Sequence, residues 1–163
     1  MSTAGAEGYD CDFVSPPPKV LQTECAVCLL ILREPHLTSC CGHSFCRACI
    51  ERVQKDGKPC PLCKKENFTT LHNGGLQRAL KELAVQCGHK GSECSWSGEL
   101  GALDNHLSMA CLFVEVECRH ANCHHITNRR DVSSHEASCG FRPFSCKWCQ
   151  KYATWYDDVK DNH

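Results

Sequence analysis

The chain has 163 residues, with 17 cysteines, ten histidines and a formal net charge of −1. Leu, Ile, Val and Phe number 32 in all, about a fifth of the residues, which is too few for one large hydrophobic core. The near-neutral charge argues against nucleic-acid binding, because arrays with that function usually carry a clear positive excess. We therefore expect several small domains, each held together by something other than apolar burial.

Bound zinc explains the cysteines better than disulfides do. The N-terminus, MSTAGAEGYD, has no apolar run, so no secretory signal is visible, and no stretch approaches the roughly 20 apolar residues of a membrane span. The cysteine count is odd, and the histidines are interleaved with the cysteines. We therefore expect a cytoplasmic, zinc-binding chain with no membrane insertion.

Residues 1–20 are predicted to be a flexible N-terminal segment. Three consecutive prolines, Pro16 to Pro18, cannot continue a helix and favour an extended lead-in. Cys11 has no partner nearby in the sequence. We interpret it as a lone thiol packed against the next domain.

Residues 21–67 carry eight candidate metal ligands in four pairs. A Cys-x-x-Cys turn lets two thiolates from one tight loop reach one ion, and two such pairs complete a closed tetrahedral zinc site. Four pairs therefore predict two zinc ions. The ligands, in chain order, are Cys25, Cys28, Cys41, His43, Cys46, Cys49, Cys60 and Cys63.

The order of the ligand types resembles that of a RING finger, with one histidine in fourth place and Cys-x-x-Cys directly after it. The resemblance implies interleaved sites. Cys25, Cys28, Cys46 and Cys49 would form the first, and Cys41, His43, Cys60 and Cys63 the second. The adjacent Cys40 and Cys41 leave a choice: Cys41 gives the Cys-x-His spacing of the RING pattern, and Cys40 would give Cys-x-x-His. We favour Cys41, which leaves Cys40 as a small buried residue or a spare ligand.

Residues 68–86 are predicted to be a linker that contains a short helix. Gly74 and Gly75 break the chain, and Leu76, Leu80 and Leu83 then recur at helical spacing. The pattern predicts an amphipathic helix over residues 76–85. We expect it to pack between two zinc modules.

A repeat of about 28 to 31 residues fills the rest of the chain. Finger 1 (87–111) and finger 2 (112–139) share an eleven-residue gap between the second cysteine and the histidine. Six residues separate the last ligand of each finger from the first ligand of the next unit. A third unit (140–163) stops one ligand short, so we expect a fragment and a weak or incomplete fifth site. The candidate ligands are Cys87, Cys94, His106 and Cys111, then Cys118, Cys123, His135 and Cys139, and finally Cys146, Cys149 and His163.

Each finger is expected to place its cysteine pair on a hairpin and its histidine on a short helix. His135 and Cys139 lie four residues apart, so both face one side of a helix. His106 and Cys111 lie five apart, which predicts that Cys111 lies beyond the end of the helix. The segment LFVEVE, residues 112–117, alternates in part and indicates a strand.

Over residues 25–163, a RING-like module, a linker helix and Cys/Cys/His/Cys fingers together look like the N-terminal half of a TNF-receptor-associated factor (TRAF). The resemblance implies small zinc-stabilised α+β modules in series: a cross-brace RING finger, a linker helix and ββα-like fingers. About four zinc ions would be bound. Members of that family usually continue into a coiled coil and a receptor-binding domain, so the resemblance also implies homo-oligomers formed through regions missing here.

The RING resemblance implies a ubiquitin-protein ligase that docks a ubiquitin-conjugating enzyme charged with ubiquitin. The acceptor would be a protein substrate or receptor that the sequence does not name. The resemblance places the docking groove on the first zinc loop, the following helix and the last zinc loop. The candidate contact residues are Val27, Ile50 or Val53, Pro61, Leu62 and Lys64 with its neighbour Lys65.

Two other functions compete with this one. A non-catalytic interaction scaffold is the main alternative, because some TRAF-like RING fingers do not dock the conjugating enzyme. Nucleic-acid binding by the fingers is disfavoured, because residues 112–151 carry only +2, six cations minus four anions.

Overall fold

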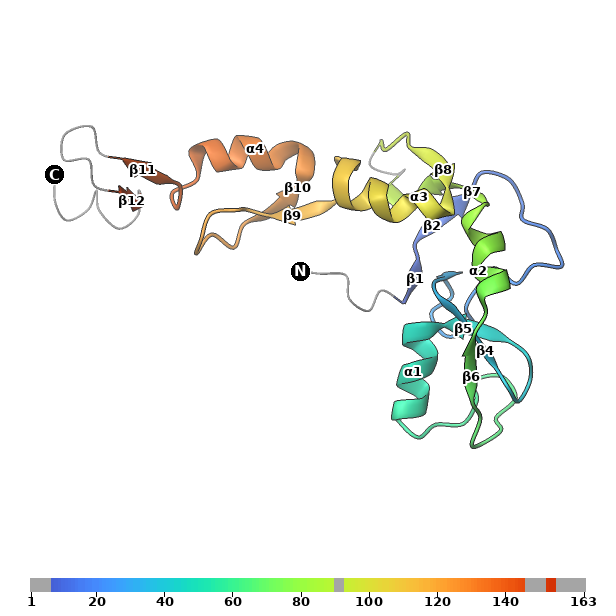
Figure 1. Cartoon of the computed structure of the whole chain (residues 1–163). Coiled ribbons are helices and arrows are strands. Elements are labelled where there is room, and N and C mark those ends of the chain that lie inside the picture. The colour runs from blue at the N-terminus through green and yellow to red at the C-terminus, as the bar shows by residue number, and fades with distance from the viewer. Residues whose placement is uncertain (1–6, 90–92, 146–151, 155–163) are drawn as a thin grey trace. The chain divides into compact units, whose positions relative to one another are not determined.

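A computed structural model of the chain describes residues 7–89, 93–145 and 152–154 (Figure 1). The chain divides into two compact units, residues 1–108 and 109–163. In the described residues, no helix is both long and apolar enough to cross a membrane.

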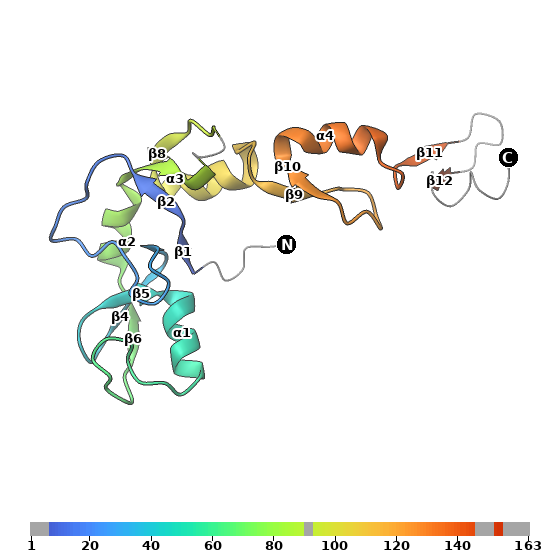
Figure 2. The same ribbon diagram turned by 180° about the vertical axis from the view of Figure 1, so that it is seen from behind.

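The RING-like module is a three-stranded sheet with one helix beside it (Figures 1 and 2). Strand β4 (Pro35–Thr38) pairs antiparallel with β5 (Ser44–Cys46) on one side and β6 (Thr70–His72) on the other. Helix α1 (Arg47–Lys55) follows β5 at once. Phe45 and Ile50 are fully buried, so the apolar face of α1 and the sheet share one small core.

Helix α2 (Gly74–Lys81) begins and ends earlier than the sequence predicted. The Asn73 side chain caps it by accepting a hydrogen bond from Leu76 N at 3.1 Å. The predicted continuation to residue 85 is wrong, because β7 (Ala84–Cys87) pairs with strands on both of its edges. Tertiary pairing therefore overrides the helical spacing of the leucines, although Leu80 still packs into the core.

Finger 1 is a hairpin followed by a helix, as the sequence predicted. Strand β7 pairs antiparallel with β8 (Ser97–Glu99), and α3 (Leu100–Asn105) follows directly. A wider, π-type turn, η2 (His106–Ala110), extends α3. Leu100 and Leu103 are buried and belong to the same core cluster as Phe45 and Ile50.

The expectation of a flexible lead-in is wrong for residues 8–13. Strand β1 (Gly8–Tyr9) pairs antiparallel with β3 (Ile31–Leu32) of the RING-like module. Strand β2 (Cys11–Phe13) pairs with β7 of finger 1 (Figures 1 and 2). We call residues 8–13 the strap, because this one segment is hydrogen-bonded to two zinc modules.

Side chains reinforce the strap. The Arg33 guanidinium lies over the Tyr9 ring, 4.1 Å from its centroid, and donates from Nη2 to Asp104 Oδ1 at 2.7 Å. Tyr9 belongs to the strap, Arg33 to the RING-like module and Asp104 to helix α3. The three side chains therefore connect all three segments of this unit.

Gly8→Ala is expected to destabilise the first unit by about 1–3 kcal/mol, because the new methyl group overpacks a tight contact. A Cβ at this buried position would lie 2.6 Å from Leu30 Cβ and 2.7 Å from the Ile31 carbonyl oxygen. Urea denaturation of the zinc-loaded protein, followed by circular dichroism, measures the change.

Gly75→Ala is the matched control, because this exposed position in α2 has room for a methyl group. It should leave stability unchanged or raise it by about 0.4–1 kcal/mol. Equal stability of Gly8→Ala and the unmodified chain would show that the strap is not packed on the RING-like module.

The second unit repeats the hairpin and helix. Strand β9 (Glu115–Glu117) pairs antiparallel with β10 (Ile126–Asn128), and α4 (Arg129–Ser138) follows. Strand β9 covers only the second half of the segment LFVEVE. A further hairpin pairs β11 (Pro143–Ser145) with β12 (Tyr152–Thr154). Three predicted ligands of the third unit, Cys146, Cys149 and His163, lie outside the described residues.

Candidate metal centres

Four groups of cysteine and histidine side chains each bring four possible ligand atoms within 4.8 Å of one another. Each group contains three or four thiols and at most one imidazole, a donor set that suits tetrahedral structural zinc. The RING-like module holds two groups and each complete finger holds one. The four groups are therefore compatible with about four zinc ions.

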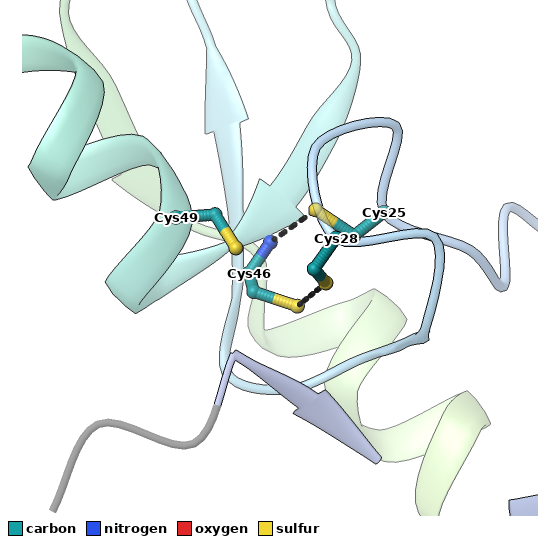
Figure 3. Close-up of side chains that lie close together, drawn as sticks. All are labelled: Cys25, Cys28, Cys46 and Cys49. Carbon is teal, nitrogen blue, oxygen red and sulfur yellow. Dashed lines mark hydrogen bonds between the residues drawn. The ribbon is translucent and has the colours of Figure 1, made fainter. Parts of the chain in front are cut away.

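The first group is Cys25, Cys28, Cys46 and Cys49, whose sulfur atoms turn toward one another in Figure 3. Cys25 and Cys28 come from the loop before β3, Cys46 is the last residue of β5, and Cys49 lies in the first turn of α1. Cys28 Sγ lies 3.9 Å from Cys46 Sγ. A Zn–S bond of about 2.3 Å in tetrahedral geometry requires an S···S edge of about 3.8 Å, so the group has the size of a zinc site.

Backbone N–H groups donate hydrogen bonds to two sulfur atoms of this group. Cys46 N donates to Cys25 Sγ at 3.4 Å, and Arg33 N donates to Cys46 Sγ at 3.3 Å. Hydrogen bonding, first with the Cys46 thiol and then with surrounding backbone N–H groups, lowers the pKa of Cys25 to about 4. The same hydrogen bond raises the pKa of the Cys46 thiol, so within this pair Cys25 is favoured as the thiolate that zinc binds.

The second group differs from the predicted set in one member. It consists of Cys40, Cys41, Cys60 and Cys63, and His43 is not among the four. Cys41 Sγ lies 3.8 Å from Cys60 Sγ, again the edge of a zinc tetrahedron. The predicted ligand Cys41 belongs to the group, and Cys40, which the sequence left as a spare ligand, is its fourth member.

His43 lies at the margin of this group. Its side chain is exposed, and its Nδ1 lies 3.3 Å from the Cys41 carbonyl oxygen. Hydrogen bonding, with the Thr38 hydroxyl first and His43 among the lesser partners, lowers the pKa of the Cys41 thiol to about 6. The imidazole therefore lies beside the Cys41 thiol of the second group.

Finger 1 groups Cys87, Cys94, His106 and Cys111. Cys94 Sγ lies 3.5 Å from His106 Nε2, close to the roughly 3.6 Å that zinc-bound sulfur and nitrogen require. The π-type turn η2 explains the spacing of five residues between His106 and Cys111. Its i→i+5 repeat brings residues five apart to the same side, so Cys111, which directly follows η2, reaches the cluster.

Finger 2 groups Cys118, Cys123, His135 and Cys139. Cys123 Sγ lies 3.4 Å from His135 Nε2, and Cys118 Sγ lies 3.9 Å from Cys139 Sγ. His135 lies on α4 and Cys139 caps its end, so the spacing of four residues fits an α-helix. The two fingers therefore use different helical turns to bring their last two ligands together.

Each finger also stacks a ring on its histidine, a feature that the sequence analysis missed. Trp96 is parallel to His106, with ring centroids 4.5 Å apart, and His125 stacks on His135 at 4.0 Å. Both stacking residues precede their histidine by ten positions, which is a signal in the repeat that the ligand count did not use. Such contacts hold the imidazole in the orientation that metal binding needs.

Residues 24–63 match the family model "Zinc finger, C3HC4 type (RING finger)". This match covers all four pairs of candidate ligands in the RING-like module. Residues 24–63 are a RING finger.

Most of the chain is similar to parts of longer proteins. It is 34% identical over 160 residues to TNF receptor-associated factor 6-B of Xenopus laevis, covering 94% of this chain and 27% of that protein. It is 35% identical over 150 residues to TNF receptor-associated factor 6 of Mus musculus, covering 88% and 26%. It is 34% identical over 125 residues to the E3 ubiquitin-protein ligase PDZRN3 of Mus musculus, covering 74% and 12%.

The RING finger and the fingers after it therefore form a TRAF-like array of zinc-stabilised modules in series. The chain spans about a quarter of the length of the receptor-associated factors that it matches and about an eighth of PDZRN3.

The RING finger exposes only some of the predicted contact residues. Ile50 is fully buried against the sheet, so its side chain offers no surface, and the expectation of contact there is wrong. Val27 and Val53 are half-buried and pack against the core. Pro61 is half-buried, and Leu62 keeps 43% of its surface exposed.

Lys64 and Leu29 are also exposed on the zinc loops. The Lys64 side chain is exposed and donates from Nζ to the Pro61 carbonyl oxygen at 2.8 Å, within its own loop. Leu29, which the sequence analysis did not select, is 77% exposed directly after the first ligand pair. Its φ of 61° places it in the left-handed region, which turns the chain at this point.

Proposed function

We propose that this chain is a ubiquitin-protein ligase module that docks a ubiquitin-conjugating enzyme and promotes transfer of its ubiquitin to a protein. The observation that carries the proposal is the RING finger at residues 24–63, whose two outer zinc loops expose apolar side chains. The similarity to PDZRN3, a protein named as an E3 ubiquitin-protein ligase, supports the same activity.

The thiols of the RING finger are unsuited to attack a substrate themselves. Eight of them gather in two clusters of structural type, where zinc would cross-link the loops and occupy the thiolates. Burial raises the pKa of the half-buried Cys11 thiol to about 12, so it stays protonated at neutral pH. The reacting thiol therefore belongs to the partner in this proposal.

The transfer itself takes place on the conjugating enzyme. A substrate lysine amine attacks the carbonyl carbon of the ubiquitin thioester, the C–N bond of an isopeptide forms, and the C–S bond breaks. The amine loses a proton and the conjugating enzyme recovers its thiol. The RING finger contributes by holding the otherwise mobile thioester in a geometry from which attack is possible.

The proposed docking surface combines Val27 and Leu29 of the first zinc loop with Pro61 and Leu62 of the last. Partly exposed apolar side chains fixed by neighbouring metal ligands are preorganised, so little conformational entropy is lost when a partner binds. Lys64 is proposed to contact ubiquitin, which requires it to leave its hydrogen bond with the Pro61 carbonyl oxygen.

The zinc fingers are proposed to extend the partner-binding surface, in the manner of TRAF-like signalling proteins. Met109, Leu112 and Ile126 are each at least half exposed in the second unit, and apolar side chains are common at binding surfaces. Among the described residues, two of its arginines pair with carboxylates: Arg119 with Glu136 and Arg130 with Asp131. These pairings reduce the positive charge that the two arginines could offer to nucleic acid.

A non-catalytic scaffold is the second candidate, favoured by the burial of Ile50, which narrows the docking surface. Autoubiquitination with a panel of conjugating enzymes separates the two functions. We expect ubiquitin chains or adducts to form with at least one member of the panel. Absence of transfer with every member, from protein that retains its zinc, would favour the scaffold.

A further inference from the structure

Three consecutive prolines, Pro16 to Pro18, lie in the segment that joins the strap to the RING finger. Proline fixes its own φ at about −65°, and it holds the residue before it in an extended or polyproline II conformation. Ser15, Pro16 and Pro17 each precede a proline, so covalent geometry alone favours polyproline II at all three. Accordingly, residues 16–18 belong to no helix or strand of the structure.

The exposure of this segment fits a polyproline II helix that presents two of its three faces. Ser15, Pro16 and Pro18 are exposed, and Pro17 between them is half-buried. In a helix with three residues per turn, residues three apart share a face. Ser15 and Pro18 therefore make up one exposed face, Pro16 lies on the second, and Pro17 lies on the third. We call residues 15–18 the proline ridge.

Both ends of the proline ridge are held in place. Before it, Val14 N donates to the carbonyl oxygen of the first residue of β7 at 2.9 Å. Directly after it, Leu21 N donates to the Pro18 carbonyl oxygen at 2.9 Å and closes a turn. The Gln22 amide then accepts from Ser44 N at 2.9 Å and donates to Ser44 O at 2.6 Å. The ridge is therefore preorganised, and a partner that binds it costs little conformational entropy.

The chemistry of the ridge fits a groove lined by aromatic side chains. Rigid proline rings pack on aromatic faces, and the carbonyl groups of a polyproline II helix form no internal hydrogen bonds, so they can accept from tryptophan or tyrosine. SH3 domains read two prolines three residues apart, a spacing that residues 16–18 lack, whereas WW domains accept consecutive prolines. The exposed Lys19 adds a cation that a carboxylate beside such a groove can pair with.

We propose that the proline ridge, with Lys19, is a docking site for a partner protein that carries a WW-type domain. Docking at this site does not depend on ligase activity, because the ridge shares no residue with the surface proposed for the conjugating enzyme. One consequence does rest on the proposed ligase function. A partner held next to the RING finger has a raised effective concentration there, which favours it as an acceptor of ubiquitin.

Titration of the zinc-loaded full chain into a panel of nitrogen-15-labelled WW domains tests the proposal. We expect at least one domain to bind saturably, with its largest amide shifts around the aromatic groove. Replacement of the groove tryptophan by alanine in that domain should abolish binding. Absence of binding to every WW domain, binding that survives loss of the tryptophan, or equally tight binding to a panel of SH3 domains would overturn the proposal.

The double variant Pro16→Ala/Pro18→Ala is expected to weaken binding by about tenfold or more, because it removes both exposed rings and keeps the half-buried Pro17. Zinc content and circular dichroism check that the variant is folded. Pro143→Ala is the matched control, since Pro143 is an exposed proline of β11 without a proline neighbour, and it should bind like the unmodified chain. Equal affinity of a folded double variant would contradict the proposal. If the double variant does not fold, the WW domain without its groove tryptophan still decides.

Discussion

Removal of zinc by a strong chelator is expected to unfold finger 2 completely. The buried core of this finger consists of three of its own metal ligands, Cys118, Cys123 and Cys139, with Phe141 packed against them. Without the metal these thiols supply almost no apolar burial, and zinc binding of this kind contributes on the order of 10 kcal/mol to folding. The helix signal of α4 in circular dichroism should therefore disappear as zinc is released.

The RING finger and finger 1 should lose structure at higher chelator concentration. Their shared core contains Leu32, Phe45, Ile50, Leu100 and Leu103 in addition to metal ligands. Hydrogen exchange read by mass spectrometry can follow the two regions separately, and released zinc should total about four ions per chain. Readdition of zinc is the control for reversibility. An unchanged spectrum after full metal removal would contradict a zinc-dependent fold.

Leu62→Glu is expected to abolish docking of the conjugating enzyme and to leave both RING metal sites filled. The side chain is 43% exposed, so the charge costs little in the free protein. In the complex, an unpaired carboxylate would be buried in an apolar contact at a cost of several kcal/mol, which weakens binding by roughly 100-fold or more. Titration calorimetry with the conjugating enzyme that carries no ubiquitin measures this loss of affinity.

Ile126→Glu is the matched control, because Ile126 is also exposed and apolar but lies on β10 of finger 2. It should bind the conjugating enzyme as tightly as the unmodified chain. Val27→Glu is a less selective test, since Val27 packs against the core and its substitution affects folding as well. If Leu62→Glu bound the conjugating enzyme as tightly as the unmodified chain does, the last zinc loop would not be part of the docking surface.

Ligand spacing predicted most of the metal sites, because the distance between paired ligands along the chain limits which ones can reach one ion. Spacing alone could not decide which of the adjacent residues Cys40 and Cys41 pairs with His43. The two cysteines are neighbours in one tight turn, so each lies at almost the same distance along the chain from the other ligands. The direction of each side chain depends on the hydrogen bonds of Ser39 and Gly42. The Ser39 bonds involve Thr69, which is 30 residues along the chain, and leave no local pattern.

The strap and the end of α2 escaped sequence analysis for a related reason. Strands of two or three residues, such as Gly8–Tyr9 and Cys11–Phe13, are too short to show alternation. Residues 84–87 directly follow the helically spaced leucines, the last of which is Leu83, but pairing on both edges makes them a strand. Ile50 was misjudged because an amphipathic helix pattern does not say which apolar residue faces the core and which faces a partner.

The proposed ligase function is tested most directly by single-turnover discharge of ubiquitin from a charged conjugating enzyme onto free lysine. Zinc content is measured on the same samples. We expect the unmodified chain to accelerate discharge, and Leu62→Glu to lose the acceleration while binding the same amount of zinc. A fully zinc-loaded, unmodified chain that fails to accelerate discharge from any conjugating enzyme tested would contradict the proposed function.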